Sequence, residues 1–218
     1  MKILDIHTHH PAPQPEGIVA LSAVELAAKY SDPAAVPLLP RQAYSIGIHP
    51  WDTLEAPAAQ VIAMLEAIAE RPETVAIGEA GIDTLRGGPM FRQLQVFKRQ
   101  IELSERLRKP LIIHEVKAHD IILSEHGDSK PAQNWSIHGF RLKPTVALPF
   151  LRKGIYLSFG AKFNPETVKS IPRERLLAET DDAPETIEQV LGALSETLGR
   201  DAAAIASANA AAFLTGNR

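Results

Sequence analysis

TVAIGEAGIDTLRGGPMFRQLQVFKRQIELSERLRKPLIIH, residues 74–114, contains one complete strand–helix–strand unit. It begins with the β-rich run Thr74–Ile77 and ends with the apolar run Pro110–Ile113. Between them, Pro89 starts a helical pattern that continues to Arg108 and carries apolar side chains at steps of three and four. Two strands joined through a helix lie parallel, because a parallel neighbour is reached only by a crossover. The unit therefore predicts a parallel sheet.

The same alternation of strand and helix extends over the whole chain. We predict eight strands, at Ile3–Ile6, Gly17–Leu21, Ala43–Ile48, Thr74–Ile77, Pro110–Ile113, Trp135–Ile137, Gly154–Phe159 and Leu176–Ala178. We predict helices from Pro57, over Pro89–Arg108, Lys117–His126, Pro144–Lys153 and Pro165–Ile171, from Pro184, and after an N-cap at Asp201. Eight strands in this order predict an α/β fold of the (β/α)8 TIM-barrel type, as one domain over residues 1–218.

The length makes this barrel compact, because such barrels rarely have fewer than about 200 residues and this chain has 218. Pro11, Pro13 and Pro15 leave no room for a helix between the first two strands, so we expect a shortened barrel that lacks that helix. An open doubly wound sheet is the alternative fold. It is disfavoured because no Gly-x-Gly-x-x-Gly motif follows the first strand.

Composition narrows the function. The chain has no cysteine, which excludes disulfides, thiolate metal sites and cysteine nucleophiles, so any metal must be held by histidine and carboxylate. Its net charge of −3 gives no global basic field for nucleic-acid binding. No apolar stretch is long enough to span a membrane, and polar residues follow Lys2 where a signal peptide would be apolar. We expect a cytoplasmic protein that contacts no membrane, and we infer no stable protein partner.

Polar residues gather at the carboxyl ends of the predicted strands. His7 and His9 close the first strand, and two residues that are two apart in an extended chain point to the same side, where both can reach one metal. Alone, this pair also fits a surface turn. Five further residues take the same position after later strands: His49, Glu79, His114, His138 and Asp181. Parallel strands bring these ends to one face of a barrel, which predicts a metal site there. His10, His119 and His126 fall outside this pattern, and we expect them in a loop or on the surface.

Six short motifs occur in a defined order. They are Ile6-His-Thr-His9, Gly47-Ile-His-Pro50, Ile77-Gly-Glu-Ala-Gly-Ile-Asp83, Pro110-Leu-Ile-Ile-His114, Ile137-His-Gly-Phe140 and Leu177-Ala-Glu-Thr-Asp181. This series resembles the TatD family of metal-dependent deoxyribonucleases, within the amidohydrolase-like barrels. The resemblance covers the chain up to Asp181 and resumes at Asn209 and Phe213.

The resemblance implies a site for two divalent cations, which could be zinc, manganese, magnesium or iron. It implies that His7, His9, Glu79 and Asp181 hold one cation, and that Glu79, His114 and His138 hold the other. Glu79 would bridge the two cations and Asp181 would act as general base, so both are the implied catalytic residues. His49 would bind substrate, and Glu179 and Asp83 would orient the ligands. The implied reaction is hydrolysis of a phosphodiester, in DNA or at nucleotide ends.

The chain departs from the family pattern at two places. After the fifth strand the family usually has Ser-Arg-Asp-Ala, whereas this chain has Glu115-Val-Lys-Ala118, so a valine stands at the arginine position. We expect Lys117, and Arg141 after the sixth strand, to meet the substrate phosphate instead. After Asp181 the family's loop is also shortened, because Pro184 follows almost at once.

Two other functions remain open. One is amidohydrolase-type cleavage of an amide, a lactone or a small ester, where the same activated water attacks carbon. The other is a metal-binding barrel without catalysis. The cationic helix around Arg92, Lys98, Arg99 and Arg106 is better explained as a solvated helix face than as a surface for DNA.

Overall fold

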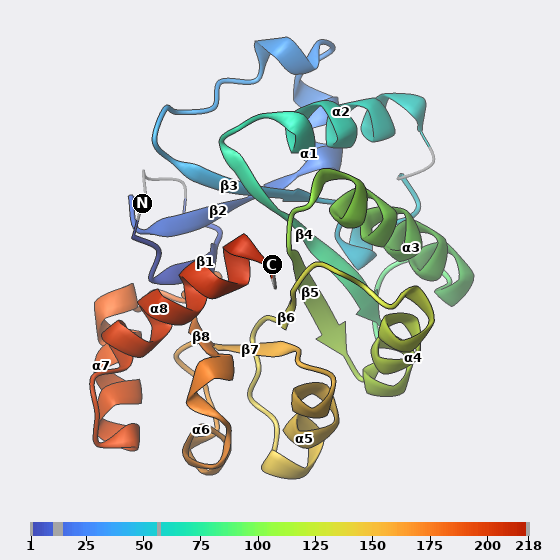
Figure 1. Ribbon diagram of the computed structural model, residues 1–218. Coiled ribbons are helices and arrows are strands. Elements are labelled where there is room, and N and C mark those ends of the chain that lie inside the picture. The colour runs from blue at the N-terminus through green and yellow to red at the C-terminus, as the bar shows by residue number, and fades with distance from the viewer. Residues whose placement is uncertain (1, 11–14, 56–57, 217–218) are drawn as a thin grey trace.

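Eight parallel strands form one sheet whose order follows the chain, β1 to β8, in this computed structural model (Figure 1). The structure describes residues 2–10, 15–55 and 58–216. The strands are β1 (Asp5–Thr8), β2 (Gly17–Ser22), β3 (Ala43–Gly47), β4 (Thr74–Asp83), β5 (Leu111–Val116), β6 (Trp135–Ile137), β7 (Tyr156–Phe159) and β8 (Leu176–Ala178). The sheet curls into a nearly closed barrel of the TIM type, which confirms the predicted fold.

All eight predicted strands are present, but several boundaries were wrong. The second, third, sixth and eighth agree to within a residue, whereas β1 starts two residues later than predicted and β4 continues six residues further, to Asp83. The prediction ended each strand where its apolar run ended. In the structure, polar residues extend the strand pairing at the carboxyl ends, so His7 and Glu79 lie inside strands and not after them.

Helices surround the sheet on the outside (Figure 1). They are α1 (Ala23–Lys29), α2 (Ala59–Glu70), α3 (Met90–Leu107), α4 (His119–Ser129), α5 (Pro144–Arg152), α6 (Pro165–Ser170), α7 (Ile187–Leu198) and α8 (Ala202–Thr215). Short 3-10 helices lie at η1 (Pro33–Ala35), η2 (Pro50–Asp52) and η3 (Arg173–Arg175). Within the described ranges, none of the helices combines the length and the apolar character that crossing a membrane requires.

Three helices differ from the prediction in whether or where they begin: α4 starts at His119 and not at Lys117, and the other two differences follow from capping. The prediction missed α1, which begins where the Ser22 hydroxyl accepts a hydrogen bond from the N–H of Glu25. It also started α7 too early, at Pro184. That helix begins at Ile187, after a capping box between Thr186 and Gln189. Residues 9, 10, 15 and 16 hold no helix between β1 and β2, as expected, while Pro11, Pro13 and the predicted helix start at Pro57 lie outside the described residues.

The amino end of the barrel is closed by α8, which lies across the opening in Figure 1. Phe213 of this helix is fully buried and packs against the ring of Tyr156 on β7. Asn209 donates hydrogen bonds to the carbonyls of Arg173 and Leu176, at 2.6 and 2.7 Å, which fixes α8 to β8. The apolar cluster at this end is Ile3, Ile6, Ile18, Ala43, Ala76, Ile112, Tyr156, Leu177, Ala210 and Phe213.

The cationic face of α3 points to solvent, as predicted. Arg99 pairs with Glu66 at 3.1 Å and Arg106 pairs with Glu70 at 3.3 Å, both on neighbouring α2. Phe97 on the opposite face of α3 is fully buried. These arginines are paired with carboxylates on the outside of the barrel, which agrees with a solvated helix face.

The barrel closes between β1 and β8 near their carboxyl ends. Thr8 and Asp181 form an isolated parallel bridge, in which His9 donates its N–H to the Asp181 carbonyl and Asp181 donates its N–H to the His7 carbonyl, both at 3.0 Å. This closure brings the first and last sequence motifs together, although His9 and Asp181 are 172 positions apart in the sequence.

Candidate metal site

Glu79 lies at the centre of the polar end of the barrel. It is inside β4, where the pairing with β5 is irregular between Ile77 and Ala80, as at a β-bulge. Such an irregularity redirects a side chain. Glu79 as a whole is 7% exposed. Neighbouring Gly47 on β3 makes room for this backbone, because a Cβ atom there would collide with the Glu79 carbonyl oxygen.

Five histidine rings surround the Glu79 carboxylate. Its Oε2 atom lies 3.3 Å from His7 Nε2 and 3.3 Å from His9 Nε2. Its Oε1 atom lies 2.6 Å from His114 Nδ1, 2.7 Å from His138 Nε2 and 3.2 Å from His49 Nε2. Each oxygen of the carboxylate therefore faces its own group of histidines.

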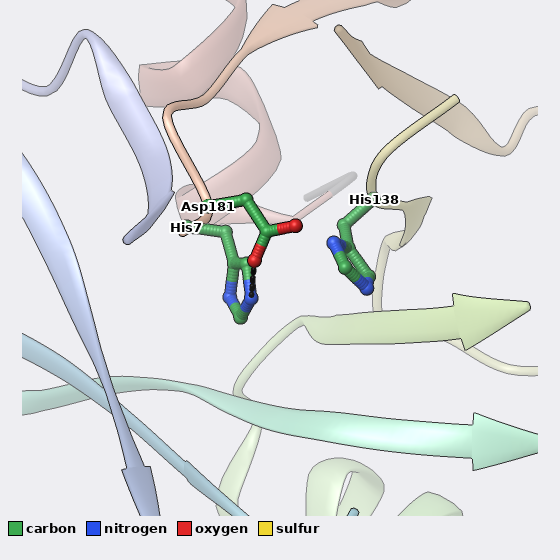
Figure 2. A group of neighbouring side chains, drawn as sticks. All are labelled: His7, His138 and Asp181. Carbon is green, nitrogen blue, oxygen red and sulfur yellow. Dashed lines mark ion pairs between the residues drawn. The ribbon is translucent and has the colours of Figure 1, made fainter. Parts of the chain in front are cut away.

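Asp181 joins this group from the loop after β8. Its Oδ1 atom lies 3.7 Å from the Nε2 atoms of both His7 and His9. Figure 2 shows the Asp181 carboxylate over the His7 ring, with His138 across from them. The structure thus brings together all six residues predicted as metal ligands, and it adds His49 to them.

The burial and spacing of the nitrogen and oxygen atoms in this cluster suit a bound cation. Both ring nitrogens of His7 are buried and have no hydrogen-bond partner among the residues that the structure describes. A buried polar atom without a partner is costly, and imidazole nitrogen is a common metal ligand. Three sets of ligand atoms lie within 4.8 Å of one another: His7, His138 and Asp181; His7, His9 and Glu79; and His49, Glu79 and His114. The residues present fit divalent cations.

The electrostatics follow from this crowding. Burial alone would raise the pKa of Glu79, but the charge of His138 and hydrogen bonds from His114 and His138 hold it well below its usual range. Burial opposes the charged form of His138, yet Glu79 and Glu179 hold the pKa of His138 well above its ordinary value. A hydrogen bond to Glu79 raises the pKa of His9 in the same way. The cluster attracts positive charge.

Glu179 and Asp83 contact the histidines from behind, in the places predicted for orienting residues. Glu179 is fully buried, lies 3.4 Å from His138 Nδ1, and accepts the N–H of Gly139 at 2.6 Å. Asp83 Oδ2 lies 3.6 Å from His114 Nε2. Each carboxylate faces the ring nitrogen that points away from Glu79, an arrangement that fixes ring orientation in metal sites.

The three residues predicted to bind substrate lie in different places. His49 lines the cavity above Glu79, which has a volume of about 420 Å³. Arg141 is exposed and lines a smaller adjoining cavity of about 100 Å³, together with Asp181. Lys117 is exposed and lies outside the residues that line either cavity.

The cavity contains residues that the prediction missed. Trp51 follows His49-Pro50 and lines the wall, and its ring centroid is 4.6 Å from that of His49. Three further carboxylates line the cavity: Glu25 of α1, Asp52 of η2, and Asp182 after β8. Trp51 could have been found as a large aromatic side chain directly after a motif histidine. The acidic residues carried no such signal.

Two histidines expected on the surface are half-buried. His119 Nδ1 lies 2.8 Å from Glu115 Oε2. The ring of His126 packs edge-on against Trp135, with 4.9 Å between the ring centroids. Their helix, α4, packs against the sheet, so these positions face inward more than the sequence pattern indicated. His10 lies in the loop after β1, as expected, where its N–H donates to Thr8 Oγ1.

Fold and site together define a class: a TIM-type barrel with a histidine and carboxylate metal site at the carboxyl ends of its strands. The chain belongs to the family of TatD related DNases, whose model matches residues 21–215.

Relatives agree with this assignment. The chain is 34% identical over 146 residues to a metal-dependent hydrolase, YabD, of Bacillus subtilis, covering 63% of this chain and 57% of YabD. It is 30% identical over 148 residues to the 3'-5' ssDNA/RNA exonuclease TatD of Salmonella typhimurium, covering 62% of this chain and 55% of that protein. The chain thus spans a little over half the length of these curated relatives.

Solved structures share the fold. The TatD homologue YjjV of Escherichia coli superposes with a TM-score of 0.75 at 21% identity, over 99% of this chain and 98% of that chain. A TatD family hydrolase of Entamoeba histolytica superposes with a TM-score of 0.76 at 15% identity, over 98% of both chains.

Proposed function

We propose that this protein is a metal-dependent hydrolase that cleaves phosphodiester bonds, in DNA or at nucleotide ends. The observation that carries the proposal is the Glu79 carboxylate, whose two oxygens face two groups of histidines. A carboxylate in this position can bridge two cations, an arrangement common to enzymes of phosphate ester hydrolysis.

The ligands divide into two groups around Glu79. His7, His9 and Asp181 stand on the Oε2 side, and they would hold the first cation with Glu79. His114 and His138 stand on the Oε1 side and would hold the second. His49 is 3.2 Å from the same oxygen, so it borders the second position. Nitrogen and carboxylate ligands suit zinc, manganese and iron, and magnesium less well.

The chain's own residues supply the proton transfers and the orientation. Bound divalent cations would lower the pKa of a water molecule and neutralise charge on the leaving oxygen. Asp181 has a side chain that is 36% exposed, so its free oxygen can accept the proton of the attacking water. Glu179 holds the ring of His138, and His49 contacts the substrate from the cavity wall.

The substrate class is supported by the relatives. The Salmonella protein is named as a 3'-5' exonuclease of single-stranded DNA and RNA. A cavity of about 420 Å³ is within the usual size range for small-molecule sites and accepts a nucleotide-sized group. We therefore propose the end of a nucleic acid strand, or a nucleotide ester, as substrate.

The test combines metal content with turnover. Mass spectrometry should find about two metal ions per chain after metal loading. Hydrolysis of bis(4-nitrophenyl) phosphate should be lost in EDTA and restored by manganese, zinc or magnesium. Bound metal without cleavage of any phosphodiester would overturn the proposal.

A second candidate is hydrolysis of an amide, a lactone or a small ester. One observation favours it: among the described residues that line the cavity, none is a lysine or an arginine. An uncharged carbonyl substrate would not need one. Turnover of a nitrophenyl ester or a lactone under conditions where the phosphodiester is stable would select this function. Metal binding without either activity would select a non-catalytic barrel.

A further inference from the structure

The cavity wall carries several carboxylates. Glu25, Asp52 and Asp182 line it in addition to Glu79 and Asp181. Cations at the metal site would neutralise the last two, but the other three would repel a second phosphate of a nucleic acid strand. A substrate with several phosphates therefore needs a positive group near the cavity.

Arg86 does not line the cavity itself, but it provides a positive group in contact with Trp51, which does. Its guanidinium carbon lies 3.6 Å from the centroid of the Trp51 ring, which places the two planar groups in cation–π contact. Trp51 in turn lies 5.9 Å, between ring centroids, from the candidate ligand His114. Arg86 is thus separated from the metal site by one aromatic ring.

One carboxylate fixes both members of this pair. Asp83 Oδ2 accepts the indole N–H of Trp51 at 2.7 Å. Its Oδ1 atom accepts the backbone N–H groups of Leu85 and Arg86, at 2.8 and 3.1 Å. Asp83 therefore does more than face His114: it sets the relative position of the indole and of the loop that carries Arg86.

The loop itself is anchored from below by Gln93. This glutamine is 2% exposed, and its amide nitrogen donates to the carbonyls of Asp83, Arg86 and Gly88 at 2.9, 3.0 and 2.9 Å. Gly87 approaches the opposite loop so closely that a Cβ atom would collide with the Pro50 carbonyl oxygen. A loop held at so many points presents Arg86 with little conformational freedom to lose on binding.

We propose that Arg86, stacked on Trp51, binds the phosphate of the nucleotide next to the one that is cleaved. This inference rests on the proposed function and adds a subsite to it. The planar guanidinium suits a phosphate because it can donate two parallel hydrogen bonds. The loop of Arg86 also adjoins the end of β5, where Thr84 donates its N–H to the carbonyl of Val116. The loop that carries Arg86 therefore lies next to the position where this chain has a valine.

The subsite predicts a difference between two substrates. Bis(4-nitrophenyl) phosphate has one phosphate, whereas a thymidine hexanucleotide has several. Arg86→Gln should raise KM for the hexanucleotide about tenfold, because a charge-assisted hydrogen bond is lost, and it should leave kcat and the KM for the small diester unchanged. Equal effects on both substrates, or no effect on the hexanucleotide, would overturn the subsite.

Arg92→Gln is the matched control. The guanidinium carbon of Arg92 also lies over an aromatic ring, 5.4 Å from the centroid of Phe91, but both residues are on α3, and Phe91, unlike Trp51, is not among the residues that line the cavity. This variant loses the same charge and should behave as the unchanged protein with both substrates. A tenfold rise in KM for this variant too would assign the effect to general surface charge and overturn the subsite.

A binding measurement separates the subsite from the proposed function. The chain has two tryptophans, so Trp135→Phe leaves Trp51 as the only fluorescent indole. In EDTA, the hexanucleotide should quench this fluorescence to saturation, and the added Arg86→Gln change should abolish the saturation. If the protein cleaves neither diester but shows this quenching, the proposed function fails and the subsite stands. Cleavage without any Arg86-dependent quenching would overturn the subsite alone.

Discussion

The two ends of this barrel are built from opposite kinds of residue. At the amino end, side chains such as Ile18, Ile112 and Leu177 meet Phe213 of α8 in a buried apolar cluster. At the carboxyl end, five histidines surround one buried glutamate within hydrogen-bond or ion-pair distance. The same strands contribute to both ends.

The two ends of the barrel therefore contribute differently: the amino end to the stability of the fold, and the carboxyl end to function. Apolar burial at the amino end stabilises the fold in proportion to the area removed from water. The carboxyl end buries polar atoms, some without partners, and therefore costs stability unless a cation satisfies them. We infer that substitutions at the amino end lower the free energy of unfolding and leave activity and metal binding intact. Substitutions at the carboxyl end should change activity and metal binding and leave the fold intact.

The largest effect is expected from Glu79→Gln at the carboxyl end. The amide keeps the size of the side chain but removes the charge that both groups of histidines face. Activity should fall at least about 10³-fold, as when a residue central to a catalytic unit is removed, and metal content should fall with it. Turnover and metal analysis of the purified variant measure both. Unchanged metal content would contradict the bridging role.

Phe213→Ala tests the amino end. The side chain is fully buried, so its loss should lower the free energy of unfolding by about 3–5 kcal/mol. Denaturant unfolding measures this, and kcat and metal content should not change under folding conditions. Phe91→Ala is the control, because Phe91 is 64% exposed and its removal should cost less than about 0.5 kcal/mol. A loss of metal in Phe213→Ala would break the separation between the two ends.

Metal loading should have an intermediate effect on stability. A ligand present at 100 times its dissociation constant stabilises the native state by about 2.7 kcal/mol. Phe213→Ala should gain the same amount as the unchanged protein. His9→Ala should gain less, and it should do so with little structural damage because the His9 side chain is 45% exposed. Thermal unfolding with and without EDTA gives these differences, and an equal gain in His9→Ala would exclude His9 as a ligand.

Sequence patterns predicted which segments form strands better than they predicted where the polar carboxyl ends of those strands lie. The apolar runs identified all eight strands, because burial on both faces leaves a continuous hydrophobic signal. The same rule ended β4 too early at Ile77, since nothing local indicates that Gly78-Glu79 continues the strand to Asp83. The helix α1 was missed although Ser22 and Glu25 carry a capping pattern, because its seven residues give little periodicity.

In the site, the meeting of the candidate ligands could be predicted from the sequence, whereas the placement of the surrounding loop residues could not. His7, Glu79 and His138 were predicted to meet because strand order alone brings the carboxyl ends of parallel strands to one face. The placement of Lys117 outside the cavity depends on how the chain turns after β5, where Lys117 itself has a φ of 52°. The support of Arg86 by Asp83 and Gln93 depends on side-chain geometry in a loop, for which no short motif exists.

The smallest expected effect concerns a histidine that belongs to neither end. Burial, and then the charge of Lys153, lower the pKa of His126 below its ordinary value of 6.5. The unfolded chain therefore binds a proton more readily than the folded one, so the stability from neutral His126 is complete above pH 6.5 and declines as the pH falls through the lowered pKa. His126→Gln removes this titration and should reduce the loss of stability between pH 7 and pH 5 by less than about 1 kcal/mol, because water screens a half-buried group. Thermal unfolding in EDTA at both pH values measures the change. Metal content should stay the same, since only histidines at the carboxyl end face Glu79, and an altered metal content would extend the functional region beyond that end.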